Sequence, residues 1–490
     1  MQIIRGGLVL DIGQRKAAKA DILLKDDEIV EVGLPDMAAP EDAREIDARQ
    51  RLIMPGLVNV HTHGHGSFGK GLGDKWSLEL LLNAAPWTSG GFTLEDKHLA
   101  AQLNAAEMVL KGCTAAYDMY FEFPTASVDG VEAIVQGYRD LGLRVTLAPM
   151  MADITLFRAI PGLMDALPPE LRARAEAMQA APQETHIAVC RDILEGWRFD
   201  RDCAQPALGP TIPLHCSDDF LTACRDLAAE HGVGIQMHLA ESKVQAAAAT
   251  TRYGMSLAAH LDGLGMLSER FTGAHCVWLD DEDLRRMSAN GANVAHNPGS
   301  NLRLGSGIAA ARSMLDHGLT VGIGTDGSVS SDNQNMFEAV RMAAFVSRTK
   351  RADPEDWLGT WDVLDMATNQ GAKLLGWGAM TGRIAPGFKA DLVLLDLANV
   401  NYVPLNDVAN QIVNCEDSSA VNSVMIGGKM ILENCKFTHF DFESLSAKVA
   451  EAVERLSHQN REQRAVSEMM ARYVSSHCVG LACGHHHPHS

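Results

Sequence analysis

The stretch Pro55-Gly-Leu-Val-Asn-Val-His-Thr-His-Gly-His65 decides how the rest of the chain is interpreted. Residues 57–60 have the length and β-branched content of a buried strand, which ends in His61-x-His63. Side chains two positions apart on an extended backbone point the same way, so these two imidazoles share one face. The pair is well placed to bind one metal ion, although two polar residues leaving a strand would show the same pattern.

Length and composition restrict the class of protein. A chain of 490 residues is too long for one compact core, so we expect one large domain and a smaller one. The net charge of −20 argues against nucleic-acid and anionic-membrane partners, because both require a basic face. No apolar run reaches membrane-spanning length, and no secretory signal is visible. The ten cysteines have no paired spacing, which suits reduced thiols, so we expect a cytoplasmic protein.

Short strands separated by Gly and Asp or Asn occupy both ends of the chain. Neither end has enough strands to bury a face alone. We therefore expect residues 1–56 and 382–440 to pair into one small β-sandwich. A long amphipathic helix is expected over 441–475, and residues 476–490, which include a His-rich tail, are expected to be disordered.

Residues 57–381 alternate apolar strands with amphipathic helices, the pattern of parallel β/α units. Eight such repeats have the size of a (β/α)₈ TIM barrel, so the expected fold class is α/β. The strands are predicted at 57–61, 113–118, 144–149, 203–209, 233–238, 271–275, 292–296 and 319–325.

Ionisable residues stand at five of the eight predicted strand ends. In a barrel of this kind the chemistry lies at the carboxyl ends of the strands, so these side chains would converge on one mouth. A lone histidine at a strand end is more often structural, but five aligned ends favour a functional site. The residues are His61 and His63, His238 with Glu241, His275, His296, and Asp326.

Three histidines with one carboxylate suit Zn²⁺ or Fe²⁺, with one position left for water. The metal would lower the pKa of that water and supply hydroxide at neutral pH. Asp326 can bind the metal and accept the water's proton, and Glu241 is near enough to shuttle protons. His275 could stabilise the negative charge of a tetrahedral intermediate.

These segments together resemble the amidohydrolase superfamily. More narrowly they resemble its cytosine deaminase and chlorohydrolase-like branch, which contains guanine, 8-oxoguanine, pterin and S-adenosylhomocysteine deaminases. The resemblance covers residues 1 to about 435, and it is much more specific for the superfamily than for the substrate. It is carried by Pro55-Gly-Leu-Val-Asn-Val-His-Thr-His63, His238-Leu-Ala-Glu241, His275, His296-Asn-Pro-Gly-Ser-Asn301 and Gly324-Thr-Asp-Gly327.

The resemblance implies a proton shuttle at Glu241 and an electrophilic or orienting role for His275. It also implies a homo-oligomer, because dimers and larger assemblies are common among such proteins. Two-metal relatives usually bridge their ions with a lysine after strand four, but no lysine occurs in residues 112–242. One divalent ion per chain is therefore expected, Zn²⁺ before Fe²⁺. The implied ligands are His61, His63, His238 and Asp326.

Four further residues are predicted to contact substrate. His65 extends the first histidine run, but Gly64 should end the strand, so a substrate contact or a plain polar residue is expected rather than a ligand. His215 follows strand four, where relatives often place a substrate contact, although a loop histidine would look the same. His296 and Asn301 complete this set.

The leading function is an aminohydrolase that releases ammonia from an amino-substituted nitrogen heterocycle, a purine, a pterin or a related ring. An alternative is removal of chloride or an alkylamine from a triazine-like ring. Chloride leaves without a proton, so the presence of Glu241 favours an amine. A remote alternative is a metal-free binding or scaffold relative, against which the four intact ligand positions argue.

Overall fold

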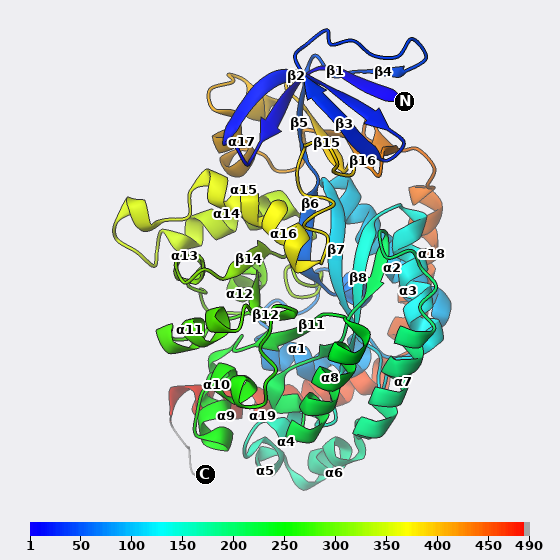
Figure 1. Cartoon of the computed structure of the whole chain (residues 1–490). Helices are drawn as coiled ribbons and strands as arrows, with labels where there is room; N and C mark the ends of the chain where they lie inside the picture. The colour runs from blue at the N-terminus through cyan, green and yellow to red at the C-terminus, as the bar shows by residue number, and fades with distance from the viewer. Residues whose placement is uncertain (485–490) are drawn as a thin grey trace.

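The computed structural model describes residues 1–484 (Figure 1), and the expected disorder of residues 485–490 lies outside the described residues. Strands from both chain ends form one nine-stranded sheet, in the order β18-β17-β16-β15-β5-β1-β2-β3 with β4 beside β1. The strands are β1 Gln2–Asp11, β2 Lys16–Lys25, β3 Glu28–Gly33, β4 Arg44–Asp47, β5 Arg51–Pro55, β15 Leu392–Asp396, β16 Val421–Ile426, β17 Lys429–Glu433 and β18 Lys436–Phe437.

The two ends of the chain meet where β5 pairs antiparallel with β15, from Arg51 opposite Asp396 to Pro55 opposite Leu392. Apolar side chains of both ends also pack into one buried cluster, for example Ile22 and Ile53 with Met425. Strands from the two ends of the chain are therefore neighbours in one sheet.

Parallel strands form two further sheets, one in the order β10-β8-β7-β6 with β9 beside β8, the other in the order β11-β12-β13-β14. Leu208 joins the two sheets, because its backbone pairs with Ile235 at the start of β11. The strands are β6 Leu57–Thr62, β7 Cys113–Tyr120, β8 Arg144–Met151, β9 Ala204–Pro206, β10 Gly209–Pro210, β11 Ile235–Leu239, β12 Phe271–His275, β13 Asn293–His296 and β14 Thr320–Ile323.

Strands occupy all eight predicted positions, but the fourth is divided into β9 and β10. Pro206 and Pro210 lie in these short pieces, and proline has no N–H to donate to a neighbouring strand. The prediction of one continuous strand over residues 203–209 was therefore wrong, because two short strands are present instead.

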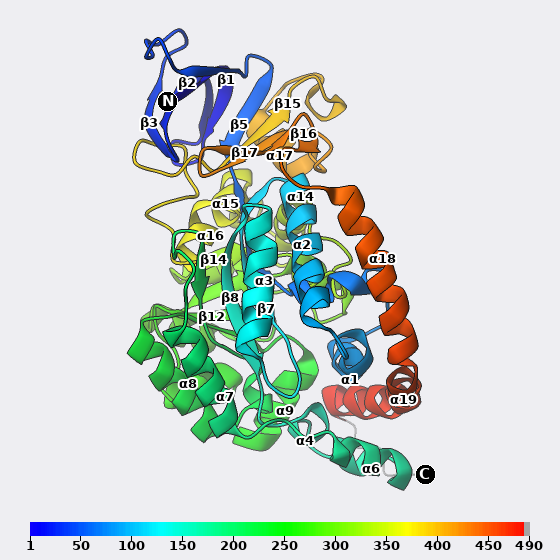
Figure 2. The same cartoon turned by 90° about the vertical axis from the view of Figure 1, so that its right-hand side faces the viewer.

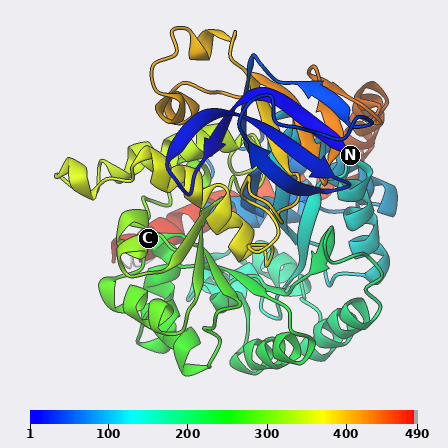
Figure 3. The same cartoon turned by 45° about the horizontal axis from the view of Figure 1, so that its top comes forward.

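Helices surround the parallel strands (Figure 3), and N-caps such as Thr93 and Ser217 begin α2 and α8. No helix within residues 1–484 is both long and apolar enough to cross a bilayer. The main ones are α1 Leu78–Thr88, α2 Leu94–Leu110, α3 Val128–Asp140, α7 Gln183–Glu195, α8 Asp218–His231, α9 Lys243–Tyr253, α10 Leu257–Gly263, α11 Asp281–Ala289, α12 Pro298–Arg303, α13 Ala311–Asp316, α14 Met336–Ser347, α15 Thr360–Met366, α16 Asn369–Leu374 and α17 Val408–Asn414.

The C-terminal region differs from the prediction of one helix over 441–475 followed by disorder. Two helices are present, α18 Phe442–Gln459 and α19 Arg461–Cys483, and they meet beside α1 (Figure 2). Met470, Val474 and Cys478 of α19 are buried at helical spacing against the insertion that follows β8, which contains α4 Leu156–Ala159, α5 Leu163–Ala166 and α6 Pro169–Ala177. This packing extends the helix to Cys483.

A buried ion pair ties the parallel strands to the nine-stranded sheet. Arg144 at the start of β8 binds Asp391, which precedes β15, with Nε–Oδ2 and Nη2–Oδ1 distances of 2.7 and 3.0 Å. The two side chains are 4% and 0% exposed.

Replacing Asp391 by alanine should destabilise the protein by about 3–5 kcal/mol, because Arg144 would keep a buried charge without a partner. Urea unfolding followed by circular dichroism would measure the change. Asp47→Ala, which removes the exposed Arg49–Asp47 pair, is the matched control and should have little effect. Equal stability of the two variants would contradict a structural role for the buried pair.

Candidate metal centre

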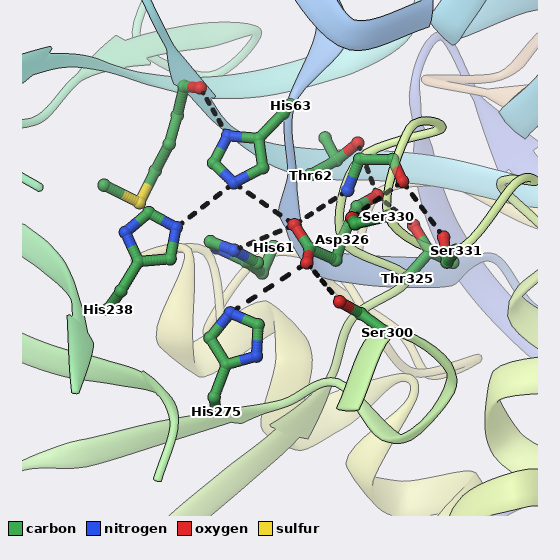
Figure 4. Close-up of polar contacts among 12 residues, drawn as sticks. His61, Thr62, His63, His238, His275, Ser300, Thr325, Asp326, Ser330 and Ser331 are labelled. Atoms are coloured by element: carbon green, nitrogen blue, oxygen red, sulfur yellow. Dashed lines mark hydrogen bonds and ion pairs between the residues drawn. The ribbon is translucent and has the colours of Figure 1, made fainter. Parts of the chain in front are cut away.

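Four loops and strand ends bring the predicted ligands to one point (Figure 4). β6 starts directly after β5, so the carboxyl ends of the parallel strands lie away from the nine-stranded sheet (Figure 1). His61 lies in β6, His63 follows it, His238 lies in β11, and Asp326 follows β14. His275, at the end of β12, is directed toward the same point.

The side-chain atoms of this group lie within a few ångströms of one another. Nε2 of His61 and Nε2 of His63 lie 3.4 and 3.1 Å from Asp326 Oδ1. Nε2 of His63 lies 3.2 Å from Nε2 of His238. Candidate ligand atoms of His61, His63 and His238 lie within 4.8 Å of one another, as do those of His61, His275 and Asp326.

Hydrogen bonds on the far side of each ring fix the tautomers of the three histidines. Nδ1 of His63 donates to Met119 O at 2.8 Å, and Nδ1 of His238 donates to Thr211 O at 2.7 Å, since a carbonyl oxygen can only accept. Nδ1 of His61 donates to Gln236 Oε1 at 2.7 Å, and the Gln236 amide is itself oriented by its bond to Val60 O.

In its neutral form, each of these rings therefore presents an unprotonated Nε2 to the centre. Nε2 of His61 is buried and has no hydrogen-bond partner within residues 1–484. Three lone pairs facing each other and a carboxylate repel one another unless a cation lies between them. A three-nitrogen, one-oxygen donor set of this kind fits a divalent metal such as zinc, with the outer hydrogen bonds orienting the ligands.

Asp326 is held in its ionised form. Burial alone raises the pKa of this carboxyl, but contacts with His61 and His63 outweigh burial and place the pKa well below its usual value. Gly327 N donates to Oδ1 at 2.7 Å and Ser300 Oγ donates to Oδ2 at 2.6 Å. The carboxylate is thus oriented as well as charged.

The pKa of Glu241 is shifted in the opposite direction to that of Asp326. It is 1% exposed, and neither carboxyl oxygen has a hydrogen-bond partner among the described residues. Burial, then the negative charges of Asp326 and Glu79, raise the pKa of Glu241 well above its ordinary value. A carboxyl with these properties can hold a proton at neutral pH and donate it to a substrate.

His275 lies between the two carboxyls. Its Nε2 is 3.6 Å from Glu241 Oε2 and 4.0 Å from Asp326 Oδ2, while its Nδ1 donates to Asn301 Oδ1 at 2.8 Å. Burial lowers the pKa of His275 to about 4, so the ring is neutral with its free lone pair on Nε2. This tautomer suits an orienting role, whereas stabilising a negative charge would require a proton on Nε2.

The four predicted substrate residues are placed differently. Asn301 is linked to the centre indirectly, because its Oδ1 accepts the hydrogen bond from His275 Nδ1. The His65 ring lies 5.6 Å from the His63 ring, and its Nδ1 accepts from Phe121 N at 3.3 Å. His215 and His296 are buried, but within residues 1–484 neither forms a hydrogen bond, ion pair or ring contact with the centre. Substrate binding by all four stays a prediction.

Two residues of the centre were missed in the sequence analysis. Gln236 could have been found, because it lies two positions before His238 and so shares its face of β11. Ser300 lies in the His296–Asn301 segment, but nothing in the sequence indicates that its hydroxyl reaches Asp326.

The sequence is similar to known proteins over most of its length. A sequence model described as the amidohydrolase family matches residues 52–431. A 5′-deoxyadenosine deaminase of Methanosarcina mazei is 31% identical over 466 residues, which cover 93% of this chain and 98% of that protein. A 5-methylthioadenosine/S-adenosylhomocysteine deaminase of Desulforamulus reducens is 31% identical over 461 residues, covering 93% and 99%.

Solved structures agree with the sequence comparisons. An adenosine deaminase from Xanthomonas campestris with bound zinc has a TM-score of 0.82 at 26% identity, covering 93% of this chain and 98% of that one. Atrazine chlorohydrolase from Arthrobacter aurescens, complexed with zinc, has a TM-score of 0.83 at 26% identity, covering 92% and 100%. With deaminase-named relatives along nearly its whole length and zinc-containing structural neighbours, the chain belongs to the amidohydrolase family.

Proposed function

We propose that the protein is a zinc-dependent deaminase that hydrolyses the amino group from the adenine ring of a nucleoside and releases ammonia. The observation that carries this proposal is the buried Glu241 carboxyl beside a donor set for one metal ion. This carboxyl has no hydrogen-bond partner among residues 1–484 and favours its protonated form. The names of the two sequence relatives described above, a 5′-deoxyadenosine deaminase and a 5-methylthioadenosine/S-adenosylhomocysteine deaminase, support the choice of ring.

His61, His63, His238 and Asp326 would hold the metal. When bound, zinc lowers the pKa of a water molecule and so supplies the hydrolytic nucleophile near neutral pH.

Glu241 and Asp326 would divide the proton transfers between them. The Glu241 carboxyl donates its proton to the ring nitrogen beside the amino-bearing carbon, which makes that carbon more electrophilic. Asp326 accepts the proton of the attacking hydroxide. Glu241, which has given its own proton to the ring, takes this proton over and passes it to the amino group, which then leaves as ammonia. His275, through Nε2, keeps the two carboxyls apart and orients the water between them.

Removal of chloride from a triazine ring is the second candidate, because atrazine chlorohydrolase shares the fold. Chloride is a good leaving group without protonation, so this reaction makes less use of a buried acid. The high proton affinity of Glu241 therefore favours departure of an amine.

A substrate panel separates the two candidates. The zinc-loaded protein should release ammonia from one or more of adenosine, 5′-deoxyadenosine, 5′-methylthioadenosine and S-adenosylhomocysteine, with the accompanying change in ultraviolet absorbance. Atrazine, followed by chloride release, should be turned over more slowly or not at all. Chloride release in the absence of any ammonia release from the nucleosides would refute the deaminase.

Four finer points belong to the same proposal. The two parallel sheets would close into one (β/α)₈ barrel over 57–381; the bond from Asp326 N to His61 O, 2.9 Å, supports closure between β14 and β6. The sheet of residues 1–56 and 382–440 would fold over its apolar cluster as a β-sandwich.

All ten cysteines are free thiols, which supports a cytoplasmic location. A homo-oligomer remains our expectation for the assembly.

A further inference from the structure

A buried carboxylate that the proposed chemistry does not use lies beside the catalytic segment. Glu79 is the second residue of α1 and is 3% exposed. Its Oε1 accepts a hydrogen bond from Ser242 Oγ at 2.7 Å, and its Oε2 accepts one from Ser77 Oγ at 2.9 Å. No lysine, arginine or histidine of the described chain lies within ion-pair distance of it. A buried carboxylate without a cation is costly and therefore requires an explanation.

Ser242 connects Glu79 to Glu241, which it follows directly. The Ser242 hydroxyl accepts from Gln245 N at 3.2 Å as the N-cap of α9, and its single proton is given to Glu79. The Gln245 side chain in turn accepts from Glu241 N at 2.8 Å through Oε1. Glu241 is thus held through its own backbone N–H, and within the described residues neither of its carboxyl oxygens has a hydrogen-bond partner.

The turn before Glu241 needs this external support. Ala240 has a φ of +48°, in the left-handed region that non-glycine residues rarely adopt and that persists only where the surroundings impose it. On the other side of Ser242, Val244 packs in an apolar cluster with Met470 and Val474 of α19. Leu80 of α1, next to Glu79, lies against the same cluster.

We propose that Glu79 is a positioning residue, which fixes the turn 240–242 through Ser242 and so places the Glu241 carboxyl at the reacting ring. The inference depends on the acid–base role of Glu241 in the proposed function. Glu79 acts without touching the substrate, because a displacement of the catalytic acid by about 1 Å can cost on the order of 100-fold in rate.

Two substitutions of Glu79 with nearly equal size test this role. Glu79→Met removes the acceptor for Ser242 Oγ, and kcat should fall by roughly 10- to 100-fold while KM changes less than about threefold. Glu79→Gln keeps an amide oxygen that can accept from Ser242, so it should recover most of the lost kcat. Metal content should equal that of the parent in both variants.

Ser242→Ala removes the same hydrogen bond from its other end, and it keeps the test informative if Glu79→Met fails to fold. A protein that carries both Glu79→Met and Ser242→Ala should lose no more kcat than the single variant with the larger loss. Ser256→Ala is the matched control: it removes the N-cap of α10 and a hydrogen bond to the Asp283 carboxylate, and Ser256 contacts neither Glu79 nor the turn 240–242. It should lower Tm and leave kcat unchanged.

Each other outcome overturns the inference. A large rise in KM with kcat retained in Glu79→Met would identify a substrate contact, and a lower Tm with unchanged kcat would identify a purely structural group. Equal losses in Glu79→Met and Glu79→Gln would exclude the hydrogen bond as the cause. These results require an active parent, so an inactive parent would refute the proposed deaminase function instead.

Discussion

Replacing His238 by alanine should remove the bound metal and the activity together. The His238 ring supplies one of three Nε2 lone pairs that converge with Asp326, and its Nδ1 is fixed by Thr211 O. Without it the metal would keep three protein ligands at most, fewer than the four expected here. Elemental analysis by mass spectrometry should find about one zinc ion per chain in the parent and far less in the variant.

The matched control is His186→Ala, which removes a buried histidine on α7 that bonds to Thr125 and Ala152 instead. It should keep its metal and its turnover, even if it is less stable. Full metal occupancy with full activity in His238→Ala would take His238 out of the ligand set and refute the centre as described.

Glu241→Gln should keep the metal and the affinity for substrate but lower kcat by roughly 10²–10⁴-fold. The amide has the size of the carboxyl and can still form hydrogen bonds, but it cannot transfer a proton. Since both Glu241 oxygens lack partners within the described chain, the substitution leaves no other buried group unsatisfied. Steady-state kinetics with metal analysis on the same sample would measure the effect.

A nucleoside that carries chloride in place of the amino group provides the internal control. Its leaving group needs no proton, so the variant should lose less activity on this compound than on the amine. Equal losses on the two compounds would argue against leaving-group protonation by Glu241. A fully active variant would exclude Glu241 from the mechanism and revive the chlorohydrolase candidate.

The ligands could be predicted from the sequence because parallel strands bring their carboxyl ends together. A residue at the carboxyl end of one such strand must therefore lie near the residues at the ends of the others. His61, His238 and Asp326 are separated widely in sequence, yet each follows or ends a recognisable apolar strand. Glu79 and Ser300 gave no such signal. Glu79 contacts Ser242, and Ser300 contacts Asp326, from helices that begin after loops. The course of a loop is not encoded in a short repeating pattern.

The end of α19 could not be predicted for a different reason. Residues 475–480, Ser-Ser-His-Cys-Val-Gly, have low helix propensity, and this favoured an end near residue 475. In the structure, burial of Cys478 and a hydrogen bond between His477 Nε2 and Pro161 O continue the helix to Cys483. Packing against distant segments outweighs local preference here.

The pairing of β5 with β15 has a consequence for how the protein is made. β5 is complete early in synthesis, but its partner Leu392–Asp396 emerges only after the whole parallel-stranded region has been translated, which takes on the order of tens of seconds. During this interval the β5 edge is an unpaired, apolar strand that can pair with other nascent chains. Slower, cooler expression or added chaperone capacity should therefore raise the yield of native protein more than changes to the catalytic loops would.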